Sequence, residues 1–273
     1  MEKKITVIKL GGALITDKST PYTMREDIIE NVASEIKECI DSGLIEGLVL
    51  IHGVGSFGHP PVLKYELYKG FKEPGQLMHL SSTQQIVNQL RTKIAEIFQK
   101  ADIPINLMHT SSLLIGNKMK ITESMFEALK GYLSLGMVPL IGGDMMYDNG
   151  MGFSVCSGDQ LSVVISREVK ASCLIFATDV EGIYDSDPKI NKEASLIREI
   201  NMDGIENIIK QLDESKAADA SGRMKGKLMT LTSIKDLIKS GLDTTILSMM
   251  QPNILKNFLE GNDVPATRIY NKN

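Results

Sequence analysis

The sequence contains no tryptophan, few aromatic residues and only three cysteines. The cysteines, Cys39, Cys156 and Cys173, are widely spaced and form no CxxC pair. This pattern argues against a disulfide framework or a zinc site and is typical of a reducing compartment. No apolar run approaches the roughly 18 residues of a membrane span, and the N-terminal run is too short for a signal peptide. We therefore expect a cytoplasmic protein.

The sequence also lacks an excess of positive charge. Its 273 residues carry 30 Lys and Arg against 34 Asp and Glu, which gives a net charge of −4. A dedicated nucleic-acid binder is expected to be basic, so this class does not fit. Because 42% of the residues are hydrophobic and the net charge is small, disorder is not expected either. A mildly acidic globular enzyme or small-molecule binder remains, long enough for one large domain or two small lobes.

Short apolar runs alternate with helical patterns along the chain. Several runs are apolar at nearly every position, as in strands of a parallel sheet that helices cover on both faces. This alternation predicts an α/β fold, a three-layer αβα sandwich with a mainly parallel central sheet. No repeat or linker divides the chain, so any division is into two lobes of one sheet. The expected strands are Ile5–Leu10, Leu48–His52, Ile103–Met108, Val138–Ile141, Cys173–Ala177 and Thr244–Ser248.

Four helices are expected between these strands. A capping box of Thr23 and Glu26 is expected to begin the first helix, and Gly43 to stop it. A second capping box, Ser157 with Gln160, should begin another. The remaining two carry apolar residues at helical spacing, namely Ile86, Leu90, Ile94 and Ile97 in one and Leu228, Leu231, Ile234 and Ile238 in the other.

Glycine, lysine, histidine and aspartate gather directly after the expected strands. In open α/β sheets, ligands bind beyond the carboxyl ends of the strands. Glycines let backbone N–H groups approach an anion, and helix N-termini add favourable dipoles. These clusters therefore predict a phosphate site. They are Lys9–Ala13, His52–His59, Gly142–Asp144, Ser157–Asp159 and Thr178–Asp185.

Three common phosphate-binding fingerprints do not fit these clusters. The run Gly53–Gly58 matches G-x-G-x-x-G, but it follows the second expected strand instead of the first. The region about 20 residues later, Phe71–Gly75, also reads as a loop, whereas the fingerprint expects a strand that ends in an acidic residue. The run Gly222–Leu228 lacks the spacing and the hydroxyl of a Walker A loop. The HRD and DFG motifs of protein kinases are absent as well. The phosphate site is therefore of another kind.

Taken in order, the clusters resemble the motifs of the amino acid kinase family. The resemblance covers about residues 4 to 250 and includes Met224-Lys225-Gly226-Lys227. Within the family, the run that ends at His59 is most similar to the isopentenyl phosphate kinases, with fosfomycin kinase as a near relative. The resemblance implies ATP- and Mg²⁺-dependent phosphoryl transfer to isopentenyl phosphate, in the mevalonate route of isoprenoid biosynthesis. It further implies a homodimer with no nucleic-acid or membrane partner.

The resemblance also implies an organisation and a set of roles. Residues 1–150 are expected to form an acceptor-binding lobe and residues 151–273 a nucleotide-binding lobe. The implied catalytic residues are Lys9 and Lys227 for the ATP phosphates, Lys18 for the transferred group, Asp159 to orient the lysines and His59 for the acceptor phosphate. The implied ATP contacts are Lys9, Gly11, Gly12, Ala13, Gly55, Ser56, Thr178, Asp179, Tyr184, Asp185, Gly222 and Lys227. The implied acceptor contacts are Gly53, Val54, Gly55, His59 and Gly143, and no residue is assigned as a metal ligand.

A phosphate acceptor suits this residue set. Its second pKa is about 6, so it is ionised at neutral pH and needs no strong general base. The difficulty is repulsion between anions, about 4 kcal/mol for unit charges ~4 Å apart at an effective dielectric constant near 20. Lysines, Mg²⁺ and backbone N–H groups can offset it. An apolar slot for the isoprenoid is expected among Val62, Leu63, Leu67, Tyr68, Phe71, Leu77, Met78, Met145 and Met146.

The sequence leaves several alternatives open. One is a kinase for another small phosphate or phosphonate such as fosfomycin. Another is a nucleotide-binding regulatory protein without turnover, since Arg223 stands where the family usually has a second glycine. Val54 likewise replaces a glycine or small residue. Asp144 could assist Mg²⁺ or cap a helix, while His79 and His109 are expected to be structural.

Overall fold

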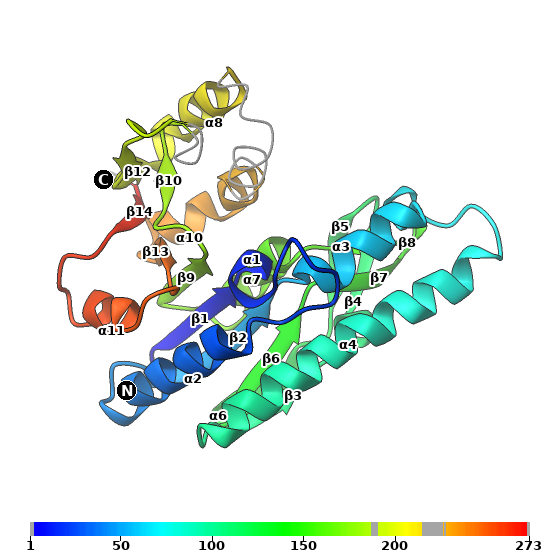
Figure 1. Cartoon of the computed structure of the whole chain (residues 1–273), viewed down its shortest axis with the longest axis horizontal. Coiled ribbons are helices and arrows are strands. Elements are labelled where there is room, and N and C mark those ends of the chain that lie inside the picture. The colour runs from blue at the N-terminus through cyan, green and yellow to red at the C-terminus, as the bar shows by residue number, and fades with distance from the viewer. Residues whose placement is uncertain (1–2, 187–190, 215–225, 227, 272–273) are drawn as a thin grey trace.

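A computed structural model describes residues 3–186, 191–214, 226 and 228–271 of the chain. A central eight-stranded sheet has the order β12-β14-β13-β9-β1-β2-β6-β3 (Figure 1). Among the described residues its one antiparallel pairing joins β13 and β14. The strands are β1 Ile5–Leu10, β2 Gly47–His52, β3 Ile105–Leu107, β6 Val138–Gly142, β9 Cys173–Thr178, β12 Glu199–Asn201, β13 Asp243–Ser248 and β14 Ala266–Tyr270. The mainly parallel sheet confirms the predicted fold class.

Helices cover both faces of this sheet. Successive residues of a strand point to opposite faces, so Val7 and Ile8 of β1 belong to different hydrophobic clusters. The cluster around Ile8 is closed by α2 (Glu26–Asp41), α4 (Gln76–Lys100) and α11 (Ile254–Leu259). The cluster around Val7 is closed by α6 (Glu127–Ser134), α7 (Gly158–Glu168), α8 (Ile205–Glu214) and α10 (Lys235–Lys239). The predicted three layers are therefore present.

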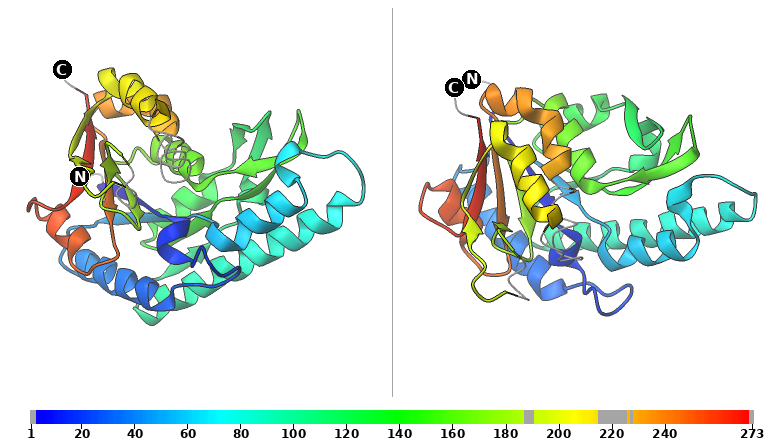
Figure 2. Two further views of the ribbon diagram at one scale, coloured as in Figure 1. Left: turned by 45° about the horizontal axis from the view of Figure 1, so that its top comes forward. Right: turned by 90° about the horizontal axis from the view of Figure 1, so that it is seen from above.

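A second sheet stands apart from the central one and was not predicted. Together with α3 (Gly55–Lys64) and one end of α4 it forms an arm to one side of the molecule (Figure 2). Its order is β5-β4-β7-β8, and its strands are β4 Leu114–Asn117, β5 Lys120–Ser124, β7 Asp144–Asp148 and β8 Gly152–Cys156. The other elements are short: α1 Gly12–Ile15, α5 Thr110–Leu113, the 3-10 turns Leu67–Lys69, Met202–Gly204 and Thr232–Ile234, and the strand pair β10 Ile183–Tyr184 and β11 Leu196–Ile197.

Most expected strands and helices are found, with three corrections. The strand expected over Ile103–Met108 is reduced to β3 at the sheet edge. The helix expected around Ile234 is interrupted by a 3-10 turn before α10. The capping box of Thr23 and Glu26 is wrong: the cap residue of α2 is Arg25, and the Thr23 hydroxyl donates to the Pro21 carbonyl.

One predicted helix signal is confirmed, and a second is confirmed in part. Gly43 follows the end of α2 with φ at +75°, a conformation that favours glycine. Ser157 caps α7, since its side chain accepts a hydrogen bond from the Gln160 N–H at 3.1 Å. The Gln160 side chain instead donates to the Met119 carbonyl. The second capping box is therefore half formed.

The three cysteines lie on different elements of the fold, namely α2, β8 and β9. Cys39 and Cys156 are buried, Cys173 is partly buried, and all three are free thiols. In the described ranges, none of the helices combines the length and the apolar character needed to cross a membrane.

Candidate active site

Three neighbouring strands of the central sheet end at the same edge. Leu10 at the end of β1 pairs with His52 of β2 and with Ala177 of β9. Helices α1, α3 and α7 begin beside these strand ends, and the first N–H groups of a helix have no partner within it. This edge therefore gathers the N-terminal ends of three helices, which favour an anion.

The glycines at this edge let two loops touch. A Cβ on Gly12 would lie 2.6 Å from the Gly55 nitrogen, and a Cβ on Gly53 would lie 2.6 Å from the Gly12 nitrogen. Gly55 also has φ at +46°. A residue with a side chain would clash at these positions, and the positive φ of Gly55 favours glycine as well. The loop after β1 and the loop after β2 can therefore pack in direct backbone contact.

The fold itself uses the N–H groups of several of these glycines. Gly11 donates to the Ala177 carbonyl at 2.7 Å, Gly53 to the Leu10 carbonyl at 2.8 Å and Gly143 to the His52 carbonyl at 3.0 Å. These three glycines therefore provide space and tight turns rather than N–H donors. The N–H groups that can face an anion are those in the first turns of α1, α3 and α7, except those of Ser56 and Gln160, which donate to the hydroxyls of Thr16 and Ser157.

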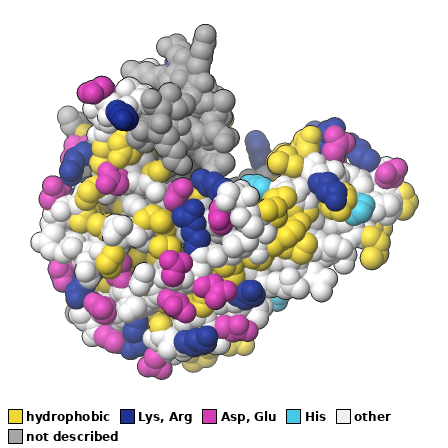
Figure 3. Space-filling view, in the orientation of Figure 1, with side chains coloured by type: hydrophobic (Ala, Val, Ile, Leu, Met, Phe, Trp, Pro, Cys, Tyr) yellow, Lys and Arg dark blue, Asp and Glu magenta, His cyan; other side chains and the backbone are white. Residues whose placement is uncertain are grey.

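A cleft of about 940 Å³ lies at this edge. Figure 3 shows basic and histidine side chains near the hollow between the arm and the rest of the molecule, with hydrophobic side chains over the arm. Of the predicted site residues, those lining the cleft are Lys9, Gly11, Gly12, Ala13, Lys18, Gly53, Val54, Gly55, Ser56, His59, Gly143, Asp159, Thr178, Asp179 and Tyr184.

Three predicted site residues are not placed in the cleft. The carboxylate of Asp185 accepts hydrogen bonds from the Ser195 N–H and the Ser186 hydroxyl, and Asp185 is not part of the cleft wall. Gly222 and Lys227 lie outside the residues that the structure describes, as does Arg223.

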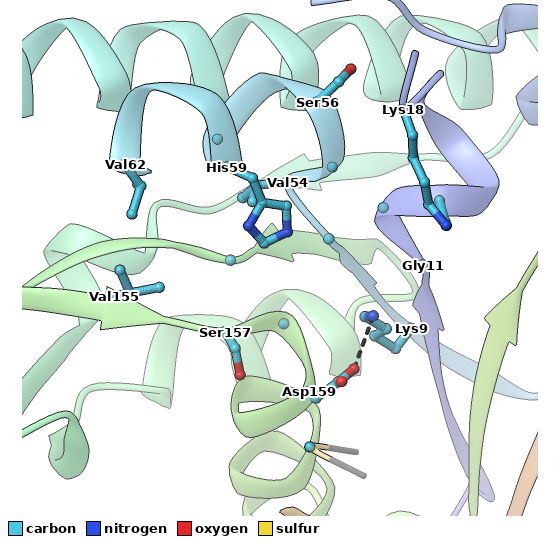
Figure 4. Close-up of a pocket in the computed structure, with 18 of the residues that line it drawn as sticks. Lys9, Gly11, Lys18, Val54, Ser56, His59, Val62, Val155, Ser157 and Asp159 are labelled. Atoms are coloured by element: carbon cyan, nitrogen blue, oxygen red, sulfur yellow. Dashed lines mark ion pairs between the residues drawn. The ribbon is translucent and has the colours of Figure 1, made fainter. Parts of the chain in front are cut away.

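An ion pair connects two of the predicted catalytic residues. Nζ of Lys9 lies 2.9 Å from Oδ1 of Asp159, and both side chains are largely shielded from solvent. Lys9 is on β1, whereas Asp159 is in the first turn of α7, where the helix dipole favours a carboxylate. The pair thus fixes the lysine ammonium beside the N-terminus of α7 (Figure 4).

A second ion pair joins Lys18, which follows α1, to Asp179 beyond the end of β9. Nζ of Lys18 lies 3.2 Å from Oδ2 of Asp179. Burial acts to raise the pKa of the Asp179 carboxyl, but Lys18, the Asp179 N–H and the Thr178 hydroxyl together outweigh burial, and the pKa lies below its usual range. Asp179 is therefore ionised at neutral pH and holds the lysine on that side of the cleft.

His59 lies on α3 and is exposed to the cleft. Its ring, Lys18 and Lys9 point into the same space, between α3 and the start of α7 (Figure 4). Val62 and Val155 flank this space on the side toward the arm. Two lysines and a histidine therefore surround one part of the cleft, and the neighbouring part of the cleft has an apolar wall.

The predicted apolar slot is present in part. Val62, Leu63, Tyr68 and Met145 line the cleft, together with Thr83, Val87, Met119 and Val155, which sequence reasoning missed. Phe71, Leu77 and Met146 line a second cavity of about 410 Å³. Leu67 is buried against Met145 and Phe153, and Met78 is exposed and lines neither cavity.

The position of Met119 depends on a buried carboxylate. Asp148 accepts hydrogen bonds from the N–H groups of Lys118 and Met119 at the tip of the β4–β5 hairpin. Burial acts to raise the pKa of Asp148, but the hydrogen bonds from Met119, Ser154 and the neighbouring N–H groups lower it to about 2. Asp148 therefore fixes the hairpin tip against the cleft.

Asp144 neither caps a helix nor faces solvent. It is the first residue of β7, and its Oδ2 lies 3.2 Å from Nη2 of Arg91. Both side chains are 1% exposed. The predicted structural roles of the two histidines fit their contacts, because His109 lies against Arg91 and His79 stacks on Tyr65. Arg91 itself was missed, since it occupies an ordinary position in a helical pattern.

Acidic side chains do not form a metal cluster in the described part of the chain. No group of three or more His, Cys, Asp or Glu residues there could hold a metal ion. Asp159 and Asp179 both reach the cleft, each paired with a lysine. Mg²⁺ in kinases is commonly held by one or two carboxylates and by substrate phosphates, and these two aspartates suit that arrangement.

The chain is similar to known proteins over most of its length. The model of the amino acid kinase family matches residues 4–247. The isopentenyl phosphate kinase of Methanocaldococcus jannaschii is 31% identical over 241 residues, which cover 82% of this chain and 85% of that protein. The isopentenyl phosphate kinase of Methanothermobacter thermautotrophicus is 31% identical over 274 residues, covering 97% and 99%. A crystal structure of an isopentenyl phosphate kinase superposes with a TM-score of 0.77 at 28% identity and covers 97% of this chain and 99% of that one.

Proposed function

The chain belongs to the amino acid kinase family, and from this membership we propose that it transfers the γ-phosphoryl group of ATP to isopentenyl phosphate. The products are isopentenyl diphosphate and ADP. The observation that carries the proposal is a single cleft in which Lys9, Lys18 and His59 surround a centre next to an apolar wall. The relatives named isopentenyl phosphate kinase, which align over most of the chain, support the same acceptor.

We assign the ATP phosphates to the side of the cleft that Lys9 and Lys18 share. Lys9 is oriented by Asp159, and Lys18 by Asp179. The first turns of α1 and α7 add N–H donors there, and Lys227, identified from the sequence, is proposed as a further ligand of the phosphates. Bound Mg²⁺ would neutralise phosphate charge, with Asp159 and Asp179 within reach as its protein partners.

The acceptor phosphate is assigned to the side that His59 and the start of α3 share. The N–H groups of Val54 and Gly55 lie at the N-terminal end of α3, and the His59 side chain can donate a third hydrogen bond. The isoprenoid tail then runs along Val62, Tyr68 and Val155 toward the arm. In this orientation the phosphate of the acceptor faces hydrogen-bond donors, and its hydrocarbon tail lies against apolar side chains.

The catalytic task is to bring two anions together. The acceptor oxygen is already ionised at neutral pH, so the site needs no strong base. Positive charge from the lysines and oriented N–H groups offsets the repulsion, most strongly as charge spreads over the transferred group. The residues gathered here are donors and cations, as this mechanism requires.

Several finer features belong to the same proposal. Residues 1–150 form the acceptor lobe, residues 151–273 form the nucleotide lobe, and the reaction requires Mg²⁺. The enzyme is a cytoplasmic homodimer in the mevalonate route of isoprenoid biosynthesis. Size measurement in solution tests the dimer, and removal of Mg²⁺ with a chelator tests the metal requirement.

An acceptor panel tests the central claim. Enzyme and Mg·ATP are incubated separately with isopentenyl phosphate, fosfomycin and isopentenol, and products are followed by ³¹P NMR and ADP release. We expect isopentenyl phosphate to be converted to the diphosphate with a kcat/KM at least about 100-fold above that of the other two. Absence of turnover with isopentenyl phosphate would refute the proposal, and a preference for fosfomycin would assign the other acceptor.

A further inference from the structure

Arg91, in the middle of α4, is one of the largest fully buried side chains in the described part of the chain, at 1% exposure. A buried arginine is costly unless its charge and all its donors find partners. The chemistry proposed above does not use this side chain, because it lies below the cleft surface and is not part of its lining. Its partners indicate what it does.

The guanidinium group joins two strand ends. Its Nε donates to Nε2 of His52, the last residue of β2, at 3.1 Å. Its Nη2 donates to Oδ2 of Asp144, the first residue of β7, at 3.2 Å. Nη1 contacts Oδ1 of Asn88 at 2.8 Å and Nδ1 of His109 at 3.0 Å. Because the guanidinium is planar and rigid, it sets the separation of the strand ends that it bridges.

This contact fixes the tautomer of His52. Arginine can only donate hydrogen bonds, so Nε2 of His52 is the acceptor and Nδ1 carries the proton. Nδ1 then donates to the Gly53 carbonyl at 3.1 Å. In a trans peptide the following N–H points opposite to the carbonyl, so the N–H of Val54 is directed away from the His52 ring. Val54 lines the cleft, and its N–H is one of the donors assigned to the acceptor phosphate.

The end of a third strand, β6, lies against the His52 ring. A Cβ on Gly142 would lie 2.0 Å from Nε2 of His52, so the imidazole packs directly against the Gly142 backbone. The next residue, Gly143, donates its N–H to the His52 carbonyl at 3.0 Å. Arg91 and His52 thus determine how Gly53 and Gly143 are spaced across the floor of the cleft.

The cluster contributes little net charge to the cleft. Burial raises the pKa of Asp144, and the neighbouring Arg91 opposes this change. Burial and Arg91 both lower the pKa of His52, to about 3, so the imidazole is neutral at physiological pH. The positive charge of Arg91 is matched by Asp144, which argues for a geometric role rather than attraction of the phosphate.

We propose that Arg91 is a positioning residue for the acceptor phosphate, acting through His52 and Asp144 to hold the Val54 N–H and the Gly53 and Gly143 backbones in their binding geometry. The inference rests on the proposed function, because it concerns the acceptor side of the same cleft. The proposed role of Arg91 differs from those of Lys9 and Lys18, because these two lysines are assigned to the ATP phosphates.

The test is steady-state kinetics of Arg91→Lys with both substrates varied. Lysine keeps the charge but cannot bridge His52 and Asp144 in one plane. We expect KM for isopentenyl phosphate to rise about tenfold, with KM for ATP within about twofold of wild type. Ile94→Ala is the matched control, because Ile94 is buried on the same helix but belongs to the hydrophobic cluster. It should lower the melting temperature while leaving KM for isopentenyl phosphate within about twofold.

Asn88→Ala is the second variant and guards against misfolding of Arg91→Lys. It removes one partner of Nη1 from a half-buried position and leaves the Arg91–Asp144 ion pair intact. We expect a smaller rise in KM for isopentenyl phosphate, about threefold, in the same direction. If wild type turns over isopentenyl phosphate and both variants keep the wild-type KM for it, the role of Arg91 is overturned but the proposed function is not. Absence of turnover by wild type overturns the proposed function and, with it, this inference.

Discussion

Nζ of Lys9 lies 2.9 Å from Oδ1 of Asp159, and this ion pair ties a central strand of the sheet to the first turn of α7. The lysine is on β1, which has β2 on one side and β9 on the other. Its ammonium is therefore carried by one of the most constrained parts of the fold. The carboxylate selects the direction in which that ammonium points.

Replacing Asp159 by Asn should impair turnover and also lower stability. The amide cannot balance the lysine charge, so Lys9 loses its fixed direction toward the ATP phosphates. We expect kcat to fall at least about tenfold. The free energy of unfolding should also fall, by about 1–3 kcal/mol, because the largely shielded Lys9 ammonium loses its charge partner. Steady-state kinetics and urea unfolding measure the two effects.

Asp236→Asn is the control for this variant. It removes the exposed ion pair with Arg167, which lies outside the cleft lining. Its kcat should match that of wild type. A kcat for Asp159→Asn that equals the control value would contradict the orienting role of Asp159.

Replacing His59 by Ala should affect the acceptor selectively. A hydrogen bond to a charged group contributes about 1.5–3 kcal/mol, so KM for isopentenyl phosphate should rise about tenfold or more. KM for ATP should stay within about twofold, because the ATP phosphates are assigned to Lys9 and Lys18. His79→Ala serves as control, since that ring stacks on Tyr65 instead of lining the cleft. Equal losses for both substrates would contradict the assignment of His59.

The buried His52 should make stability depend on pH. Burial and Arg91 lower its pKa to about 3, whereas an unfolded chain has a histidine pKa near 6.5. Between these values the unfolded state binds the proton and the folded state does not. The free energy of unfolding is therefore highest well above pH 6.5 and falls as the pH drops toward 3. At pH 5 the loss due to His52 should be about 2 kcal/mol relative to high pH.

Urea unfolding at several pH values measures this effect. His109 also has a pKa lowered by burial and by Arg91, so its contribution has the same sign. His52→Asn removes one titrating group, and its free energy of unfolding should fall less steeply below pH 6.5 than that of wild type. Parallel pH profiles for the two proteins would show that His52 does not stay neutral.

The sequence was sufficient to predict the central strands because their residues obey one simple rule. Both faces of β1, β2 and β9 are covered, so nearly every position is apolar. The second sheet follows no such rule. Lys120–Ser124 forms β5 although its side chains are mostly exposed, and its short polar sequence does not differ from that of a loop. This sheet forms because its strands pack against the rest of the arm, and a local sequence pattern does not show such packing.

The failure at the start of α2 has a specific tertiary cause. Thr23 and Glu26 have the spacing of a capping box, but Thr16 and Met24 form an isolated bridge. The Thr23 carbonyl accepts a hydrogen bond from the Asp17 N–H at 3.0 Å. This contact keeps residue 23 extended, and α2 begins only at Glu26. A local sequence pattern does not reveal a competing strand-like contact.

The cleft gathers most of the predicted site residues that directly follow strands, whereas sequence reasoning missed the lining residues that come from elsewhere in the chain. Lys9 and His59 belong to glycine-rich runs, whereas Met119 reaches the cleft from a hairpin tip. Arg91 is 39 residues from His52 and 53 residues from Asp144. Such partners can be found only when the fold places α4 beneath the two strand ends.

The central place of β1 also has a consequence for how the protein could be divided. In the proposed assignment, β2 and β6 carry the acceptor side of the cleft and β9 carries the nucleotide side, and β1 lies between β2 and β9 in the sheet. A fragment cut near residue 150 would keep β1 but leave its β9-facing edge without a partner, a row of open N–H and C=O groups that promotes aggregation. The two sides are therefore not modules that can be exchanged one at a time between kinases, because each depends on the same six-residue strand to close its sheet.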